Sequence, residues 1–92
     1  MKVKFFATLR RVVGGKEVNF DAPPGVTVQQ LIGLMIAQFP DLRQEMLDEE
    51  GRLYQHVHIF INGRDANFLA SGLDTPIAAD DEIGVFPAVG GG

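Results

Sequence analysis

The sequence predicts an α+β fold in which a mixed sheet of four to five strands packs on one main helix. Two short segments that alternate polar and apolar residues, at 2–9 and 17–21, precede a single long amphipathic stretch at 27–39. Further strand-like segments follow it, at 56–61, 64–68 and 82–88. A single helix placed between two groups of strands can cover one face of the sheet that those strands form.

The first two segments are expected to form a hairpin. Residues 2–9 alternate, with Val3 and Phe5 on one face. A Gly-Gly pair within residues 10–15 marks a turn. Residues 17–21 then alternate again, which is the pattern of a second strand that pairs with the first.

The main helix is expected to begin after Thr27, because Gln30 stands at capping-box spacing from it. Pro40 ends the helix, since the residue before proline disfavours helical backbone. Apolar side chains recur between these limits at helical spacing and predict one buried stripe: Val28, Leu31, Ile32, Met35 and Phe39.

The second half of the chain supplies the remaining strands. Residues 56–61 give the best strand pattern, and Asn62-Gly63 is a strong signal for a tight turn after it. The first and last strands are the most apolar, so we expect them to be central, parallel neighbours. A hairpin, a covering helix and this central pair make the β-grasp, or ubiquitin-like, architecture.

Length and composition restrict the class of protein. Ninety-two residues suit one domain, which we place at residues 1–89, with a flexible glycine tail at 90–92. A net charge of −4 argues against nucleic acid as a partner, since phosphate contacts need clustered Lys and Arg. No signal peptide is evident, and no apolar run approaches the ~20 residues that span a bilayer. We therefore expect a cytoplasmic protein without membrane contact.

Catalytic and metal sites are not evident in the sequence. The absence of Cys excludes a thiolate zinc site and a cysteine nucleophile. His56 and His58 share a strand face at a spacing that can hold a metal, but no third ligand accompanies them. We therefore expect both histidines to face solvent or to lie at the rim of a surface patch.

The sequence ends in three glycines, Gly90, Gly91 and Gly92, directly after an apolar strand-like segment. Glycine has no Cβ and adopts φ values that other residues avoid, so such a tail fits a narrow tunnel. The carboxylate of Gly92 would be a reactive group placed by chain position, and we expect it to be the working end of the protein. Taken alone, the three glycines are also consistent with a frayed tail.

Four segments together resemble the MoaD/ThiS-type family of ubiquitin-like sulfur carriers and small modifiers. They are VKFFATLR at 3–10, VHIFING at 57–63, GLDTPI at 72–77 and DDEIGVFPAVGGG at 80–92. The resemblance covers essentially the whole chain. The segment at 72–77 and the end of the chain are most similar to the cysteine-synthesis and archaeal-modifier branches.

The resemblance implies that an E1-like enzyme adenylates Gly92, with Gly91 beside it, using ATP and magnesium. The acyl-adenylate would become a thiocarboxylate that delivers sulfur in molybdopterin, thiamine, cysteine or tRNA-thiolation pathways. The acceptor would be a molybdopterin synthase large subunit, a thiazole synthase or a cysteine synthase type of enzyme. The chain itself would be a carrier and not an enzyme, with no bound cofactor and no metal.

An exposed aromatic face is also predicted. By strand alternation, Phe6, Phe60 and Phe86 fall on the sheet face away from the helix, where they would cluster if their strands are neighbours. The resemblance implies that partner enzymes dock on this face. It adds three further contacts, at Pro87, Val89 and Gly90. The alternative is a second small core beneath a loop or a dimer contact.

Three other functions use the same features. The first is a protein modifier in which Gly92 is joined to target lysines through the same activation. The second is a stable small subunit, as in molybdopterin synthase, whose tail enters the active site of a larger partner. The third is a β-grasp binding module with an inert tail.

Overall fold

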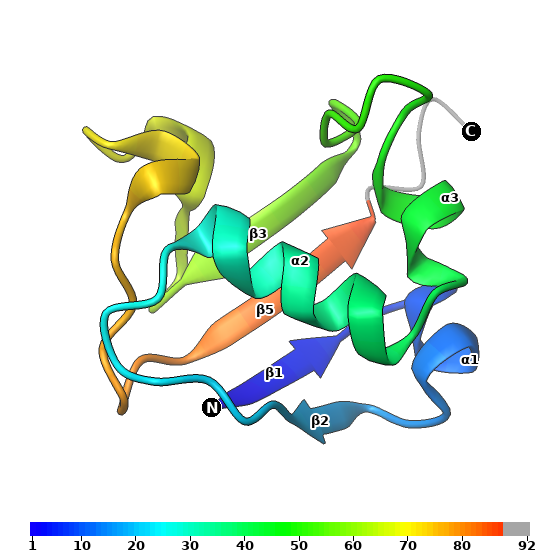
Figure 1. Cartoon of the computed structure of the whole chain (residues 1–92), viewed down its shortest axis with the longest axis horizontal. Helices are drawn as coiled ribbons and strands as arrows, with labels where there is room; N and C mark the ends of the chain where they lie inside the picture. The colour runs from blue at the N-terminus through cyan, green and yellow to red at the C-terminus, as the bar shows by residue number, and fades with distance from the viewer. Residues whose placement is uncertain (88–92) are drawn as a thin grey trace.

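The computed structural model describes residues 1–87, which form a mixed five-stranded sheet with a helix across one face (Figure 1). The elements in chain order are β1 (Lys2–Phe5), α1 (Leu9–Val13), β2 (Glu17–Asn19), α2 (Val28–Gln38), α3 (Leu42–Met46), β3 (Val57–Ile61), β4 (Arg64–Asp65), the 3₁₀ turns η1 (Ala66–Phe68) and η2 (Gly72–Asp74), and β5 (Ile83–Pro87). The sheet order is β2-β1-β5-β3-β4. This is the predicted β-grasp architecture.

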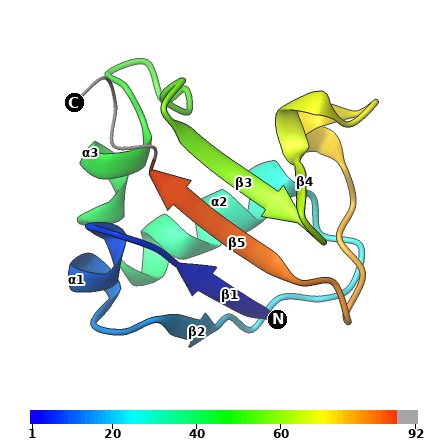
Figure 2. The ribbon, with the colours of Figure 1, turned by 180° about the vertical axis from the view of Figure 1, so that it is seen from behind.

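The central strands are β1 and β5, and they run parallel, as predicted. Val3 pairs with Ile83, and Phe5 pairs with Val85. On its other side β5 pairs with β3 in antiparallel register. Helix α2 crosses one face of this sheet, and among the described residues no helix crosses the opposite face (Figure 2).

Helix α2 begins as the sequence predicts. The Thr27 hydroxyl accepts a hydrogen bond from the Gln30 backbone N–H at 3.1 Å, and the Gln30 side-chain oxygen accepts from the Thr27 N–H at 3.0 Å. This capping box satisfies two backbone donors that a helix start otherwise leaves unpaired. The predicted stripe lies against the sheet, with Leu31 fully buried and Phe39 half-buried.

The core lies between α2 and the sheet and follows the alternation of each strand. Alternate residues are buried along the three middle strands, and within residues 1–87 every buried side chain of this core is hydrophobic. The buried strand residues are Val3, Phe5, Val57, Ile59, Ile61, Ile83 and Val85. Since strand side chains alternate between faces, their neighbours are directed to the uncovered face.

The first strand is shorter than predicted, and the predicted turn after it is a helix. β1 ends at Phe5, and a short helix, α1, replaces the turn predicted at 10–15. Ala7 adopts a left-handed φ of 54°, which redirects the chain and allows Leu9 to be fully buried. Gly14, with a φ of 78°, ends α1 as a left-handed C-cap, which glycine adopts without a Cβ penalty.

The turn after β3 is the predicted one. Asn62 and Gly63 both have positive φ, at 51° and 82°, as a type I′ hairpin turn requires. The strand predicted at 64–68 is shorter, because β4 ends at Asp65 and η1 follows. A carboxylate oxygen of Asp65 accepts a hydrogen bond from the Asn67 N–H at 2.9 Å, which supports this turn.

We predict that Leu31→Ala lowers the free energy of unfolding by about 2–5 kcal/mol, because it leaves a cavity in the core. Leu34→Ala is the matched control on the same helix, since the Leu34 side chain is 37% exposed. The control should cost less than about 1 kcal/mol. Urea unfolding measures both values, and equal losses would contradict the assigned orientation of α2.

Candidate functional site

Three aromatic side chains from separate strands meet on the uncovered face of the sheet. Phe6 follows β1, Phe60 lies on β3 and Phe86 lies on β5. The rings of Phe6 and Phe86 stack, with centroids 4.8 Å apart and planes at 25°. Phe60 meets Phe86 edge-on, with centroids 6.4 Å apart. We call Phe6, Phe60 and Phe86 the aromatic face.

The aromatic face is accessible to solvent. The Phe86 residue is 43% exposed, and Phe6 and Phe60 are half-buried. Rings that stack on one another while part of each stays exposed form a rigid apolar surface, and such patches mark interaction sites. The geometry therefore suits docking of a protein with an apolar pocket.

Gly84 is a site residue that the sequence analysis did not single out. It lies on β5 between Lys4 and Phe60 in register, and a Cβ built on it would lie 3.4 Å from the Phe6 ring. Gly84 lines a hollow of about 310 Å³ together with Phe6, Phe60 and Phe86. Strand alternation could have identified Gly84, since it stands two residues before Phe86.

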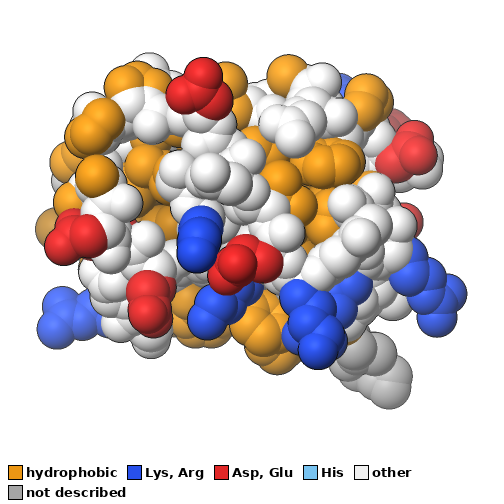
Figure 3. All heavy atoms as spheres, turned by 90° about the horizontal axis from the view of Figure 1, so that it is seen from below, with side chains coloured by type: hydrophobic (Ala, Val, Ile, Leu, Met, Phe, Trp, Pro, Cys, Tyr) orange, Lys and Arg blue, Asp and Glu red, His pale blue; other side chains and the backbone are white. Residues whose placement is uncertain are grey.

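Arg10 holds the end of β1 next to the aromatic face. Its Nε–H donates to the Phe5 carbonyl oxygen at 2.9 Å, and its guanidinium carbon lies 5.4 Å from the Phe6 ring centroid. Such a position over a ring is attractive through the ring quadrupole. In the view from below, most Lys and Arg side chains lie in the lower half, where Asp and Glu side chains and hydrophobic side chains lie between them (Figure 3).

The two histidines do not combine into a metal site. Nδ1 of His58 lies 2.7 Å from a carboxylate oxygen of Asp65, and the His56 ring stacks on Tyr54 with centroids 5.1 Å apart. Within residues 1–87 no three His, Cys, Asp or Glu side chains are grouped so that they could hold a metal ion. His58 instead lies at the rim of the aromatic face, 6.2 Å from the Phe60 ring.

The predicted tail contacts are only partly described. Pro87 ends β5 opposite Val57, and its side chain is buried. The predicted site residues Val89, Gly90, Gly91 and Gly92 lie outside the described residues. Their roles therefore stay predictions, as does the partner contact of Pro87.

Two exposed apolar side chains lie away from the aromatic face. Phe68, on η1, is 87% exposed, and Leu34 on α2 is 37% exposed. Neither was predicted, since the sequence around Phe68 read as a brief strand. Across residues 1–87 there is no helix with the length and apolar character that a membrane span requires.

The sequence matches a known protein family and several of its relatives. The model of the ThiS family matches residues 3–92. Small archaeal modifier protein 1 of Haloferax volcanii is 33% identical over 92 residues, which is all of both chains. A putative sulfur carrier protein of Archaeoglobus fulgidus is 36% identical and covers all of this chain, with 98% of its own length matched.

Solved structures show the same fold. The crystal structure of SAMP1 from Haloferax volcanii superposes with a TM-score of 0.85 at 33% identity, over 100% of this chain and 98% of that one. A chain in the crystal structure of the Amycolatopsis orientalis BexX/CysO complex superposes with a TM-score of 0.79 at 27% identity. That match covers 99% of this chain and 98% of the other.

We predict that Phe86→Ala leaves the domain folded, because the side chain it removes is half-exposed. A double-mutant cycle with Phe6→Ala should give a coupling of about 0.5–1.5 kcal/mol, the range for stacked aromatic pairs. The same cycle between Phe6 and the exposed Phe68 is the control and should give no coupling. Urea unfolding measures both cycles. If Phe86→Ala unfolds the protein, Phe86 belongs to the core and the assigned face is wrong.

Proposed function

Because the chain belongs to the ThiS family, we propose that it is a sulfur carrier whose Gly92 carboxylate is adenylated and then converted to a thiocarboxylate. Its fold is the ubiquitin-like β-grasp, and its relatives are named as sulfur carriers and modifiers. A carrier needs a surface that a partner holds and a reactive end that the partner reaches. The chain has a candidate for each.

The observation that carries the proposal is the place of the aromatic face along the chain. Phe86 is the exposed residue of β5 immediately before Pro87, and residues 88–92 follow with three glycines. The six residues from 87 to 92 span at most ~20 Å when extended. A partner that holds the aromatic face therefore has the Gly92 carboxylate within ~20 Å of its docking surface.

The chemistry divides between carrier and partner. A carboxylate is a poor acyl donor, so a carboxylate oxygen of Gly92 attacks the α-phosphate of ATP and displaces pyrophosphate. A hydrosulfide ion then attacks the acyl carbon, AMP leaves, and loss of the sulfur-bound proton gives the thiocarboxylate. ATP and magnesium belong to the activating enzyme. The carrier contributes position, since binding holds the reacting groups together and so removes the entropy cost of bringing them together.

The partners we propose are an E1-like activating enzyme and a sulfur-accepting enzyme. The acceptor is of the molybdopterin synthase large-subunit, thiazole synthase or cysteine synthase type. The CysO protein whose structure resembles this chain was solved in complex with BexX, which supports a carrier that works in contact with another protein. The aromatic face is the docking surface in each case.

We predict that incubation with a cognate E1-like enzyme, ATP and a sulfur source converts the protein to a thiocarboxylate. Intact-mass analysis should show the gain of one oxygen-to-sulfur exchange, mapped to Gly92. Deletion of Gly92, or Gly91→Phe, should abolish the gain and leave thermal unfolding unchanged. Gly33→Ala is the control, because Gly33 is exposed on α2 and a Cβ there meets no atom within 4 Å. An unmodified wild-type mass would contradict the proposal.

A second candidate function is a protein modifier, favoured by the relative named small archaeal modifier protein 1. Here a lysine amine of a target attacks the acyl-adenylate, AMP leaves and an isopeptide bond forms at Gly92. The activation step and the docking surface are those of the carrier. The two functions are compatible in one protein.

We predict that conjugation, if it occurs, leaves a long remnant on target lysines. No Lys or Arg follows Arg64 in the sequence, so trypsin would leave residues 65–92 attached. A search for the short glycine remnant alone would therefore miss the adducts. Mass spectrometry should instead find branched peptides that join residues 65–92 to a foreign lysine. Their absence from cells that contain the thiocarboxylate form would leave the carrier function alone.

A further inference from the structure

Charge is distributed unevenly along the chain. Residues 1–20 hold five of the eight Lys and Arg but only one of the twelve Asp and Glu. The rest of the sequence holds three basic and eleven acidic residues. The first twenty residues are therefore basic although the net charge of the chain is −4. The fold determines where on the surface these cations lie.

Three of these cations border the aromatic face: Lys4, Arg10 and Lys16. Lys4 is exposed on β1 and stands two residues before Phe6, so both point to the same side of the sheet. The Phe5 N–H donates to the Lys16 carbonyl oxygen at 2.9 Å, which brings Lys16 next to the end of β1. The arrangement comes from the hairpin of β1 and β2, with α1 between them.

The cations and the aromatic rings share a continuous surface. Lys4, Phe6, Arg10 and Lys16 line one hollow of about 330 Å³. Lys4 and Phe6 also line the neighbouring hollow above Gly84, which contains Phe60 and Phe86. A partner that covers the aromatic rings therefore also meets the cations on the β1 side.

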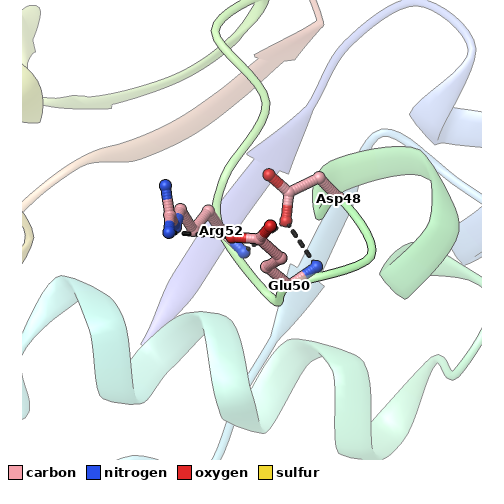
Figure 4. Close-up of polar contacts among 3 residues, drawn as sticks. All are labelled: Asp48, Glu50 and Arg52. Atoms are coloured by element: carbon pink, nitrogen blue, oxygen red, sulfur yellow. Dashed lines mark hydrogen bonds and ion pairs between the residues drawn. The ribbon is translucent and has the colours of Figure 1, made fainter.

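These cations have no fixed counter-charge within residues 1–87. The ion pair described there is Arg52 with Glu50, at 2.8 Å (Figure 4), and Asp65 is engaged by Nδ1 of His58, at 2.7 Å. Glu17 is the register partner of Lys4 and lines the same hollow, yet the two form no ion pair. The ammonium groups of Lys4 and Lys16 are therefore available to a partner.

The other side of the aromatic face differs. Asp65 is the charged group of β4 on this side, and both of its oxygens are engaged, one by His58 and one by the Asn67 N–H. Glu82, which precedes β5, lines the hollow at the end of the strand away from Phe86. The surface thus carries Lys4, Arg10 and Lys16 on the side of β1, with Glu17 as the carboxylate beside them, and Asp65 on the side of β4.

We propose that Lys4 and Lys16 bind carboxylates on the protein partner that docks on the aromatic face. This inference rests on the proposed function, in which that partner is an E1-like activating enzyme. The partner has an apolar pocket for Phe6 and Phe86, bordered by Asp or Glu on the side that meets β1 and β2. Complementary charge at the rim speeds association and excludes wrong orientations. Since the charge lies on one side only, it fixes which way the partner faces.

The test compares two double variants with equal net charge. Lys4→Gln with Lys16→Gln removes the proposed contacts, and Arg43→Gln with Arg64→Gln is the matched control at exposed positions on α3 and β4. Arg10 is left intact, because its bond to the Phe5 carbonyl and its contact with Phe6 give it a positioning role. Calorimetry measures the Kd for the cognate activating enzyme at roughly 0.05 M and 0.5 M salt.

At low salt we expect the Kd of the Lys4/Lys16 variant to rise about fivefold or more, while the control changes less than about twofold. High salt should weaken the wild type and narrow this difference, because salt screens exposed charges. Lys4→Arg with Lys16→Arg should bind like the wild type. Equal losses in the two double variants, or no loss in either, would overturn the inference.

The same samples separate this inference from the proposed function. If the wild type is adenylated and the Lys4/Lys16 variant binds the enzyme as tightly as the wild type, the proposed carboxylate contacts are wrong and the carrier function stands. If the wild type is neither bound nor adenylated, both are wrong. Binding of a single-stranded oligonucleotide by the wild type, lost in the Lys4/Lys16 variant, would assign the surface to a polyanion and overturn the inference.

Discussion

The parallel pairing of β1 with β5 is the constraint on which the rest of the structure depends. It joins segments about eighty residues apart, with Val3 beside Ile83 and Phe5 beside Val85. Closing so long a loop costs entropy that the contacts must offset. Here the offset comes from burial, because these four side chains lie in the same hydrophobic core as the buried residues of α2. The same pairing brings Phe6 next to Phe86, so the core and the aromatic face form together.

The two faces of the sheet are therefore not independent. Side chains alternate along a strand, and a slip of one residue exchanges the buried and exposed sets. Burial of Val85 between Phe5 and Ile59 in register is what directs Phe86 outward. Hydrophobic packing on the far side of the sheet sets the geometry of the aromatic face, and the hydrogen bond from Arg10 to the Phe5 carbonyl oxygen supports it.

The sequence predicted the features that local patterns control. Thr27 and Gln30 predicted the start of α2, and Asn62-Gly63 predicted the second hairpin. Each of these signals consists of residues that are close together in the sequence. Helix α1 was missed, since it depends on the left-handed Ala7 and on the burial of Leu9, which are consequences of packing. The position of Lys4, Arg10 and Lys16 beside the aromatic face was not predicted, for a related reason. The net charge of −4 does not show where the cations lie. Lys16 is distant from Phe5 in the sequence and lies beside it only because β1 and β2 form a hairpin.

β5 has neighbours on both sides, β1 in parallel and β3 in antiparallel pairing. In the proposed function, an enzyme that drew the last residues into its active site would pull along the axis of this strand. Such a force loads both hydrogen-bond ladders in shear, so many bonds resist it at once. A strand at the edge of the sheet has only one ladder, so fewer bonds would resist the same pull. A partner could therefore pull on the C-terminal end of the chain without unfolding the domain.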